Sequence, residues 1–252
     1  MVRRFCATVL VLATATATAA CGARSALGDP STACEQLGIG ILGNPGAYNG
    51  ADFEQWLTMS GATVQRIQTT PGEPVTAATL QAFDVVVLDW LTRDYAASEA
   101  ATFAAWVAAG GGVVSMTGWD NITTDDWHPN SLLAPLEVAY GGPLLNGPVT
   151  DLAAHPITDG LTSVVFKGGY AIEDLGGNAS VRTPIASLPA AGAAGGKVNV
   201  GYAIQMGKGR AFAWGDEWIE FTSEGQMFPP QLWVQAFAWI APARRCVLTP
   251  PS

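Results

Sequence analysis

Residues 84–118 have the sequence DVVVLDWLTRDYAASEAATFAAWVAAGGGVVSMTG. The β-branched apolar run at 84–89 is typical of a parallel strand that is buried on both faces. The apolar periodicity of 96–109 predicts an amphipathic helix, and the glycines at 110–112 end it. The run 113–116 predicts a second strand that leads directly into a Thr-Gly turn. This strand–helix–strand unit is the signature of an α/β fold.

The same alternation continues toward the N-terminus. The patterns predict a strand at 38–42, a helix at 52–60, a strand at 63–68 and a helical turn at 76–82. Strands that alternate with helices indicate a flavodoxin-like parallel sheet with helices on both faces. Right-handed crossovers bring the strand carboxyl ends to one edge, where such sheets bind ligands. The loops after Leu42, Leu88 and Met116 therefore form the wall of the predicted site.

The second half of the chain is richer in strand patterns. We predict strands at 136–140, 163–166, 183–187, 198–206 and 209–214, an Ala/Gly-rich loop at 189–196 and a closing helix at 232–240. No linker divides the chain, so one α/β domain over 38–242 is expected.

The N-terminus has the pattern of an export signal. Two arginines precede an apolar, small-residue segment at 5–20, which is too short for a stable membrane anchor. Small residues directly before Cys21 resemble a bacterial lipobox, although Thr18 stands where leucine is usual. The alternative is an ordinary signal peptidase site. We expect a leader at 1–21, a tether at 22–37, a tail at 243–252, and a protein that is lipid-anchored in the cell envelope, secreted or periplasmic.

The cysteines agree with export. Cys6 lies in the leader and Cys21 is the predicted lipidation site, which leaves Cys34 and Cys246 at the two ends of the domain. In an oxidising compartment, two such cysteines predict one disulfide. A loop of this length gains about 3–5 kcal/mol of stability in the chain-entropy description.

The net charge of the 252-residue chain limits the kinds of partner that it is expected to bind. The formal net charge is −9, and no stripe of Lys or Arg is present. Such a surface repels nucleic acid and anionic lipid, so membrane association is expected only through a lipid anchor. The oligomeric state stays open.

Three motifs carry a family resemblance. They are GGGVVSMTG at 110–118, HPITDGL at 155–161 and GKGRAFAWGDEW at 207–218. In this order and spacing they resemble the ThuA-like (trehalose-utilisation) branch of the class I glutamine amidotransferase-like superfamily. The resemblance covers roughly 38–240 and implies the same α/β layout.

The chain departs from that family at the catalytic positions. Amidotransferases place a nucleophilic cysteine on the elbow after the fourth strand, whereas this chain has Ser115-Met116-Thr117-Gly118. ThuA-like proteins tend to carry a histidine at the position of Thr117, and Asp216-Glu217 occupies the place of the late His-Glu pair. A thiolate mechanism is therefore unsupported. The favoured hypothesis is a protein that binds a ligand without catalysis.

Acidic and indole side chains follow the predicted strands at their carboxyl ends. The predicted ligand-binding set is Asp89, Trp90, Trp119, Asp120, Asp216, Glu217 and Trp218. Indole faces beside carboxylate acceptors suit a sugar ring, so a carbohydrate or another small polar ligand is expected. Three alternatives stay open: the carboxylates bind a hard cation such as Ca²⁺, they cap turns, or Asp216, Glu217 and Asp89 perform acid–base catalysis.

These patterns leave three hypotheses for function. The first is an exported, non-catalytic protein that binds a small polar ligand and has no cofactor. The second is a hydrolase or isomerase that acts on a sugar derivative through carboxylates. The third is a surface module for protein interaction, which would present an exposed apolar patch rather than a cleft.

Overall fold

A computed structural model of the protein describes residues 34–43, 51–67, 72–118, 127–217 and 230–250, and eight strands within them form one mixed sheet. Five neighbouring strands are parallel, and in sheet order they are β2 (Thr63–Ile67), β1 (Gly38–Leu42), β3 (Val85–Leu88), β4 (Gly112–Met116) and β10 (Gly209–Trp214). The sheet continues with antiparallel pairing through β9 (Lys197–Met206), β8 (Val181–Pro189) and β6 (Asp151–Leu152).

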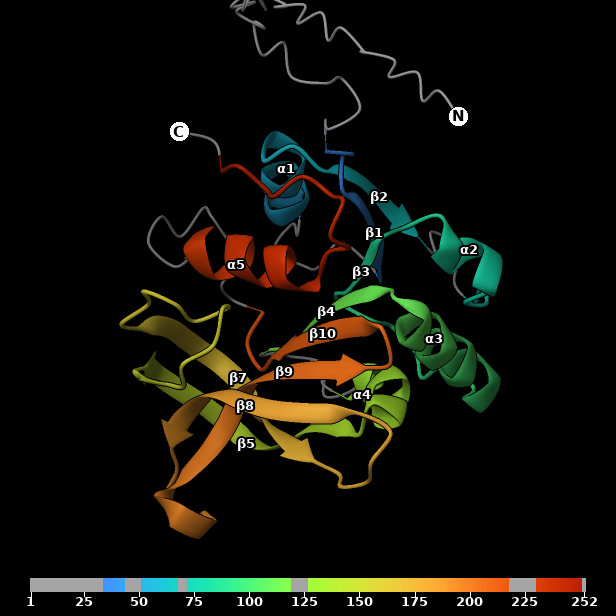
Figure 1. The fold of residues 1–252 in the computed structure, drawn as a ribbon. Helices are drawn as coiled ribbons and strands as arrows, with labels where there is room; N and C mark the ends of the chain where they lie inside the picture. Colours follow the sequence, from blue (N-terminus) through green and yellow to red (C-terminus); the bar gives the residue numbers. More distant parts are fainter. Residues whose placement is uncertain (1–33, 44–50, 68–71, 119–126, 218–229, 251–252) are drawn as a thin grey trace, which may run out of the picture. The chain divides into compact units, whose positions relative to one another are not determined.

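Helices cover both faces of this sheet (Figure 1). Side-chain alternation assigns the faces, since Val85 and Val87 point into one apolar cluster while Val86 and Leu88 point into the other. The first cluster includes α1 (Ala51–Met59) and α5 (Pro230–Ile240), and the second includes α2 (Ala77–Gln81), α3 (Ala97–Ala109) and α4 (His128–Leu133). The predicted fold class is confirmed: an α/β protein with a flavodoxin-like parallel half and a β-rich C-terminal half.

A second, two-stranded antiparallel sheet consists of β5 (Val138–Val149) and β7 (Val164–Asp174), and we call it the ribbon. The ribbon crosses the carboxyl end of β10 at a contact between two glycines. A Cβ atom on Gly169 would lie 2.0 Å from the carbonyl oxygen of Gly215, and a Cβ atom on Gly215 would lie 2.0 Å from that of Tyr170. The amide of Tyr170 donates to the Gly215 carbonyl at 2.7 Å. Only glycine permits this close approach of two backbones.

The ends of the described chain are joined covalently. Cys34 and Cys246 form a disulfide, with Cα atoms 5.0 Å apart, as the sequence predicted. Arg245 reinforces this junction through ion pairs with Glu35 at 2.6 Å and Asp84 at 2.8 Å. The predicted leader and its Cys21 lie outside the described residues. Among the helices that the structure describes, none is long and apolar enough to cross a membrane.

The elements of the first half match the predicted ones closely, and those of the second half are longer. The strands predicted at 136–140 and 163–166 overlap only the first residues of β5 and β7, because the prediction ended them near Gly141 and Gly168. Gly141 lies at the bulge of the ribbon, and Gly168 lies beside the crossing at Gly169, so neither glycine ends its strand. The segment 134–136 forms a 3₁₀ turn, η2 (Ala134–Leu136), and a second one, η3 (Ala194–Gly196), precedes β9. The short helix α4 and strand β6 were not predicted.

Candidate functional site

The elbow after β4 is sealed in this chain. Ser115 is fully buried and Thr117 is 4% exposed. The ribbon covers the elbow, and the hydroxyl of Tyr140 donates to Ser115 Oγ at 2.9 Å. Burial raises the pKa of the Tyr140 phenol, so it keeps the hydrogen that it donates. A hydroxyl in this state is a poor nucleophile, because a general base must be able to reach it.

Asp216 and Glu217 follow β10 and are also buried. The Oδ2 atom of Asp216 accepts a hydrogen bond of 2.6 Å from the backbone amide of Lys167 on the ribbon. Glu217 packs against Gly118, where a Cβ atom would lie 2.5 Å from the Glu217 Cγ atom. Asp216 thus helps to hold the ribbon in place, and Glu217 joins the loops that follow β4 and β10.

Asp89, at the end of β3, contacts an arginine of β2, which lies beyond β1 in the sheet. It is 1% exposed, and its Oδ2 atom lies 3.3 Å from Arg66 Nη2 on β2. The same arginine contacts Glu54 of α1 and donates to the Gly43 carbonyl at 3.0 Å. Trp90 has a positive φ of 51°, which is uncommon outside glycine. These contacts fasten the loops after β1 and β3 to each other.

The predicted strand-edge set is therefore only partly brought together. Strand β4 lies between β3 and β10, so Asp89 and Asp216 are roughly 10 Å apart at two strand spacings. Trp119, Asp120 and Trp218 lie outside the described residues. Among the residues that the structure describes, no group of three or more His, Cys, Asp or Glu is arranged to hold a metal ion.

Both histidines contact groups of the protein itself. His155 accepts a hydrogen bond from the Ile157 amide at 3.2 Å, as befits its predicted turn, and its ring meets Trp239 edge-on at 5.0 Å. Burial lowers the pKa of His155, so the ring is neutral at physiological pH. His128 begins α4, and its Nδ1 atom lies 2.8 Å from the Asp94 carboxylate.

A cavity of about 620 Å³ lies elsewhere, between the ribbon, strand β9 and the loop that follows β8, and we call it the ribbon cavity. A register shift opens it: Gly141 pairs with Ala171 and Leu145 pairs with Gly169, so β5 has two more residues than β7 in this interval. Such bulges bend a strand and redirect its side chains. Much of the wall consists of residues with no side chain beyond Cβ, namely Gly141, Gly142, Ala171, Ala190, Ala191 and Ala193.

A directed chain of hydrogen bonds ends at the wall of the ribbon cavity. Ser187 Oγ donates to Asn199 Oδ1 at 3.1 Å, and Asn199 Nδ2 donates to the Tyr202 hydroxyl at 2.8 Å. Tyr202 is 3% exposed and lines the cavity. Its oxygen is used as an acceptor, and its own hydrogen has no acceptor among the described residues.

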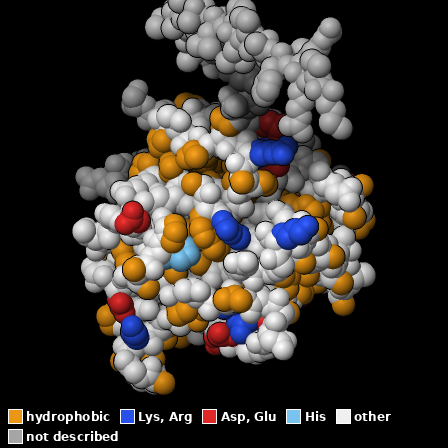
Figure 2. Space-filling model, viewed as in Figure 1, with side chains coloured by type: hydrophobic (Ala, Val, Ile, Leu, Met, Phe, Trp, Pro, Cys, Tyr) orange, Lys and Arg blue, Asp and Glu red, His pale blue; other side chains and the backbone are white. Residues whose placement is uncertain are grey.

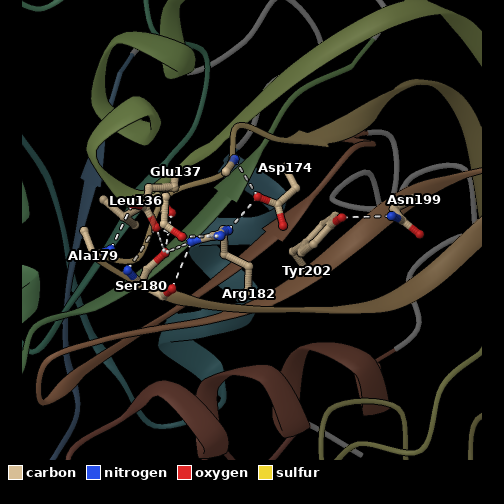
Figure 3. A network of polar contacts seen from close by, with 10 residues as sticks. Leu136, Glu137, Asp174, Ala179, Ser180, Arg182, Asn199 and Tyr202 are labelled. Atoms are coloured by element: carbon tan, nitrogen blue, oxygen red, sulfur yellow. Dashed lines mark hydrogen bonds and ion pairs between the residues drawn. The ribbon is translucent and has the colours of Figure 1, made fainter.

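The carboxylates of the ribbon cavity belong to Glu173 and Asp174. Arg182 holds Asp174 through an Nε–Oδ1 contact of 2.7 Å and also pairs with Glu137 (Figure 3). Glu137 has a positive φ of 66° and accepts from the amides of Ala179 and Ser180, which lower its pKa. Asp174 and the loop after it are therefore fixed at the end of β7.

The sequence prediction missed the ribbon cavity. Glu173, Asn199 and Tyr202 lie inside strands, where no turn or motif marks them. Their meeting depends on the ribbon folding over β9, and a strand pattern does not report that contact. The one available signal was the Gly-Gly-Pro sequence at 141–143 between apolar residues, which favours a bulge.

The face of the molecule in Figure 2 shows few charged side chains. Lys and Arg stand apart from one another there, and several lie beside an Asp or Glu. The view shows no continuous basic band on this face.

The geometry defines an α/β protein in which packed side chains occupy the elbow after β4. No protein-family model and no curated protein matches the chain. Among solved structures, the mmIFT52 N-terminal domain matches with a TM-score of 0.60 at 12% identity, over 80% of this chain and 96% of that one.

Two bacterial structures have a similar fold. The cytoplasmic protein STM1381 from Salmonella typhimurium LT2 matches with a TM-score of 0.58 at 14% identity, over 82% of this chain and 100% of that one. A putative ThuA-like protein from Bacteroides uniformis ATCC 8492 matches with a TM-score of 0.50 at 18% identity, over 84% of this chain and 94% of that one. The fold is thus shared with ThuA-like proteins, and identities this low carry no more than the fold.

Proposed function

We propose that this chain is an exported, non-catalytic relative of ThuA-like proteins that binds a small polar ligand, of which carbohydrate is the leading class. We place the ligand in the ribbon cavity. The observation that carries this proposal is the cavity itself, with about 620 Å³ of space, a largely apolar wall and a few fixed polar groups. This combination of size and lining is typical of small-molecule sites.

The sealed elbow supports binding without catalysis. Ser115 is buried under Tyr140, and Asp216 accepts from the ribbon backbone. Asp89 is occupied by Arg66. These contacts engage the elbow hydroxyl and two of the three carboxylates predicted for acid–base catalysis, which favours a structural role for these three groups.

The disulfide supports export. A bond between Cys34 and Cys246 persists in an oxidising compartment and is rare in the reducing cytosol of mesophiles. Together with the leader pattern at 1–21, it favours a cell-envelope or secreted location. Mass spectrometry of the mature N-terminus would show whether Cys21 carries lipid.

Ligand binding is testable by thermal unfolding of the purified protein with glucose, glucosamine, N-acetylglucosamine and glucuronate. A ligand present at 100 times its dissociation constant raises the unfolding free energy by about 2.7 kcal/mol. We expect at least one sugar to stabilise the wild type. We also expect Ala171→Leu, which fills the ribbon cavity, to weaken that ligand at least roughly tenfold.

The matched control is Ala101→Leu, which makes the same change on an exposed position of α3 and should leave binding intact. No stabilisation by any of the four sugars would contradict a carbohydrate ligand. Stabilisation that survives Ala171→Leu would contradict the ribbon cavity as its site.

A further inference from the structure

We infer that the ribbon cavity selects a hydroxylated small molecule that also carries a protonated amine, as an amino sugar does. This inference rests on the proposed function and adds the charge and polarity of the ligand. It is carried by the Glu173 carboxylate, the Tyr202 hydroxyl and the lack of any Lys or Arg among the described residues that line the cavity.

Glu173 supplies an uncompensated negative charge. Its carboxylate lies over Gly141, where a Cβ atom would be 2.8 Å from Oε1, so the glycine makes room for it. Among the described residues, Glu173 has no hydrogen bond or ion pair. Asp174 beside it is paired with Arg182, which also pairs with Glu137. The cavity therefore has a net negative field, which attracts a cation and repels an anion.

Tyr202 supplies a hydrogen-bond donor. Ser187 donates to Asn199, and Asn199 donates to the Tyr202 oxygen. The Tyr202 oxygen therefore acts as an acceptor, and its hydrogen is available for an acceptor in the cavity. Burial raises the pKa of Tyr202, and the phenol keeps this hydrogen at physiological pH. A ligand must therefore offer an oxygen acceptor here, since a buried donor without a partner is costly.

The two groups together define the ligand class. A simple alkylamine pairs with Glu173 but leaves the Tyr202 hydrogen without an acceptor. A neutral sugar satisfies Tyr202 but leaves the charge of Glu173 without a counter-ion. A molecule with both an ammonium group and hydroxyl groups satisfies both, and the apolar side chains of Leu145, Ile172 and Val198 accept its C–H surface.

Isothermal titration of the full protein with glucosamine, glucose and glucuronate tests this inference. We expect glucosamine to bind roughly three- to tenfold more tightly than glucose, because the ion pair is partly exposed, and glucuronate to bind most weakly. Glu173→Gln should bring glucosamine down to the level of glucose and leave glucose unchanged. Tyr202→Phe should weaken glucosamine and glucose alike, by about fivefold.

Asp159→Asn is the matched control, because it removes the same charge from an exposed position outside the ribbon cavity. It should leave the glucosamine preference intact. Equal binding of glucose and glucosamine with no effect of Glu173→Gln would overturn the amine assignment and leave the proposed function standing. Absence of binding by all three sugars would overturn this inference, and absence of binding by N-acetylglucosamine as well would also contradict a carbohydrate ligand.

Discussion

Two buried tyrosines show why one region of this protein is closed and another is open. Tyr140 on the ribbon gives its hydrogen to Ser115 at the elbow. Tyr202 on β9 receives a hydrogen from Asn199 and keeps its own for the ribbon cavity. Both side chains are at most 3% exposed. Burial alone therefore does not distinguish the covered elbow from the wall of the ribbon cavity, whereas the direction of the tyrosine hydrogen bond does.

The comparison also shows that the ribbon has different effects at two places in the fold. In open α/β sheets the ligand usually lies at the strand carboxyl ends. Here the ribbon crosses that edge, and its polar groups form hydrogen bonds with Ser115 and Asp216. The same ribbon bulges at Gly141–Leu145 and leaves space over β9. One structural element therefore covers the elbow and also forms a wall of the ribbon cavity.

The largest effect is expected from Gly169→Ala at the crossing. The added methyl group would lie 2.0 Å from the Gly215 carbonyl and would force the ribbon off the elbow. We expect a loss of about 3 kcal/mol or more in unfolding free energy, measured by urea denaturation. Gly142→Ala in the same ribbon is the control, since only its positive φ of 85° opposes it and about 1 kcal/mol is expected. Equal losses for the two variants would refute the crossing as the closing contact.

Tyr140→Phe should have an intermediate effect. It removes the donor to Ser115 and leaves that buried hydroxyl without this partner, at a cost of about 1–3 kcal/mol. Tyr202→Phe removes a hydroxyl at the wall of a cavity and should cost less than about 1 kcal/mol. Thermal unfolding of both variants measures the difference. A larger loss for Tyr202→Phe would reverse the comparison between the closed and open regions.

Alkaline pH should produce a modest further loss of stability through Tyr140. Burial raises the pKa of Tyr140 above its ordinary value near 10, so the unfolded chain releases this proton first as the pH rises. The stabilisation is complete below pH 10 and is lost above it, by about 1.4 kcal/mol at pH 11 for one tyrosine. Tyr140→Phe should therefore flatten the stability profile between pH 10 and 11. An unchanged slope would contradict the raised pKa.

The parallel half was predictable because its physics is local. The apolar run at 84–89 and the helix pattern at 96–109 each bury a face that their own periodicity defines. The disulfide was predictable because Cys34 and Cys246 were the two cysteines left at the ends of the domain. The ribbon was underpredicted because Gly141, Gly168 and Gly169 look like strand ends, and their tolerance depends on contacts with distant residues.

The candidate site shows the same limit. Placing Asp89 and Asp216 at strand ends was right, but their partners Arg66 and the Lys167 amide come from other elements. Sequence position alone does not tell whether a carboxylate serves a ligand or a neighbour. Glu173 and Tyr202 carry no local signal, and only the tertiary contact of the ribbon with β9 brings them to one cavity.

The strand order has a consequence for biosynthesis. β4 pairs with β10, yet residues 117–208 lie between them in the chain. The parallel sheet stays unfinished until nearly the whole polypeptide has been made, and the Cys34–Cys246 bond closes later still. Long-range pairing of this kind folds slowly. The chain therefore reaches its disulfide-locked state only after nearly all of it has been synthesised.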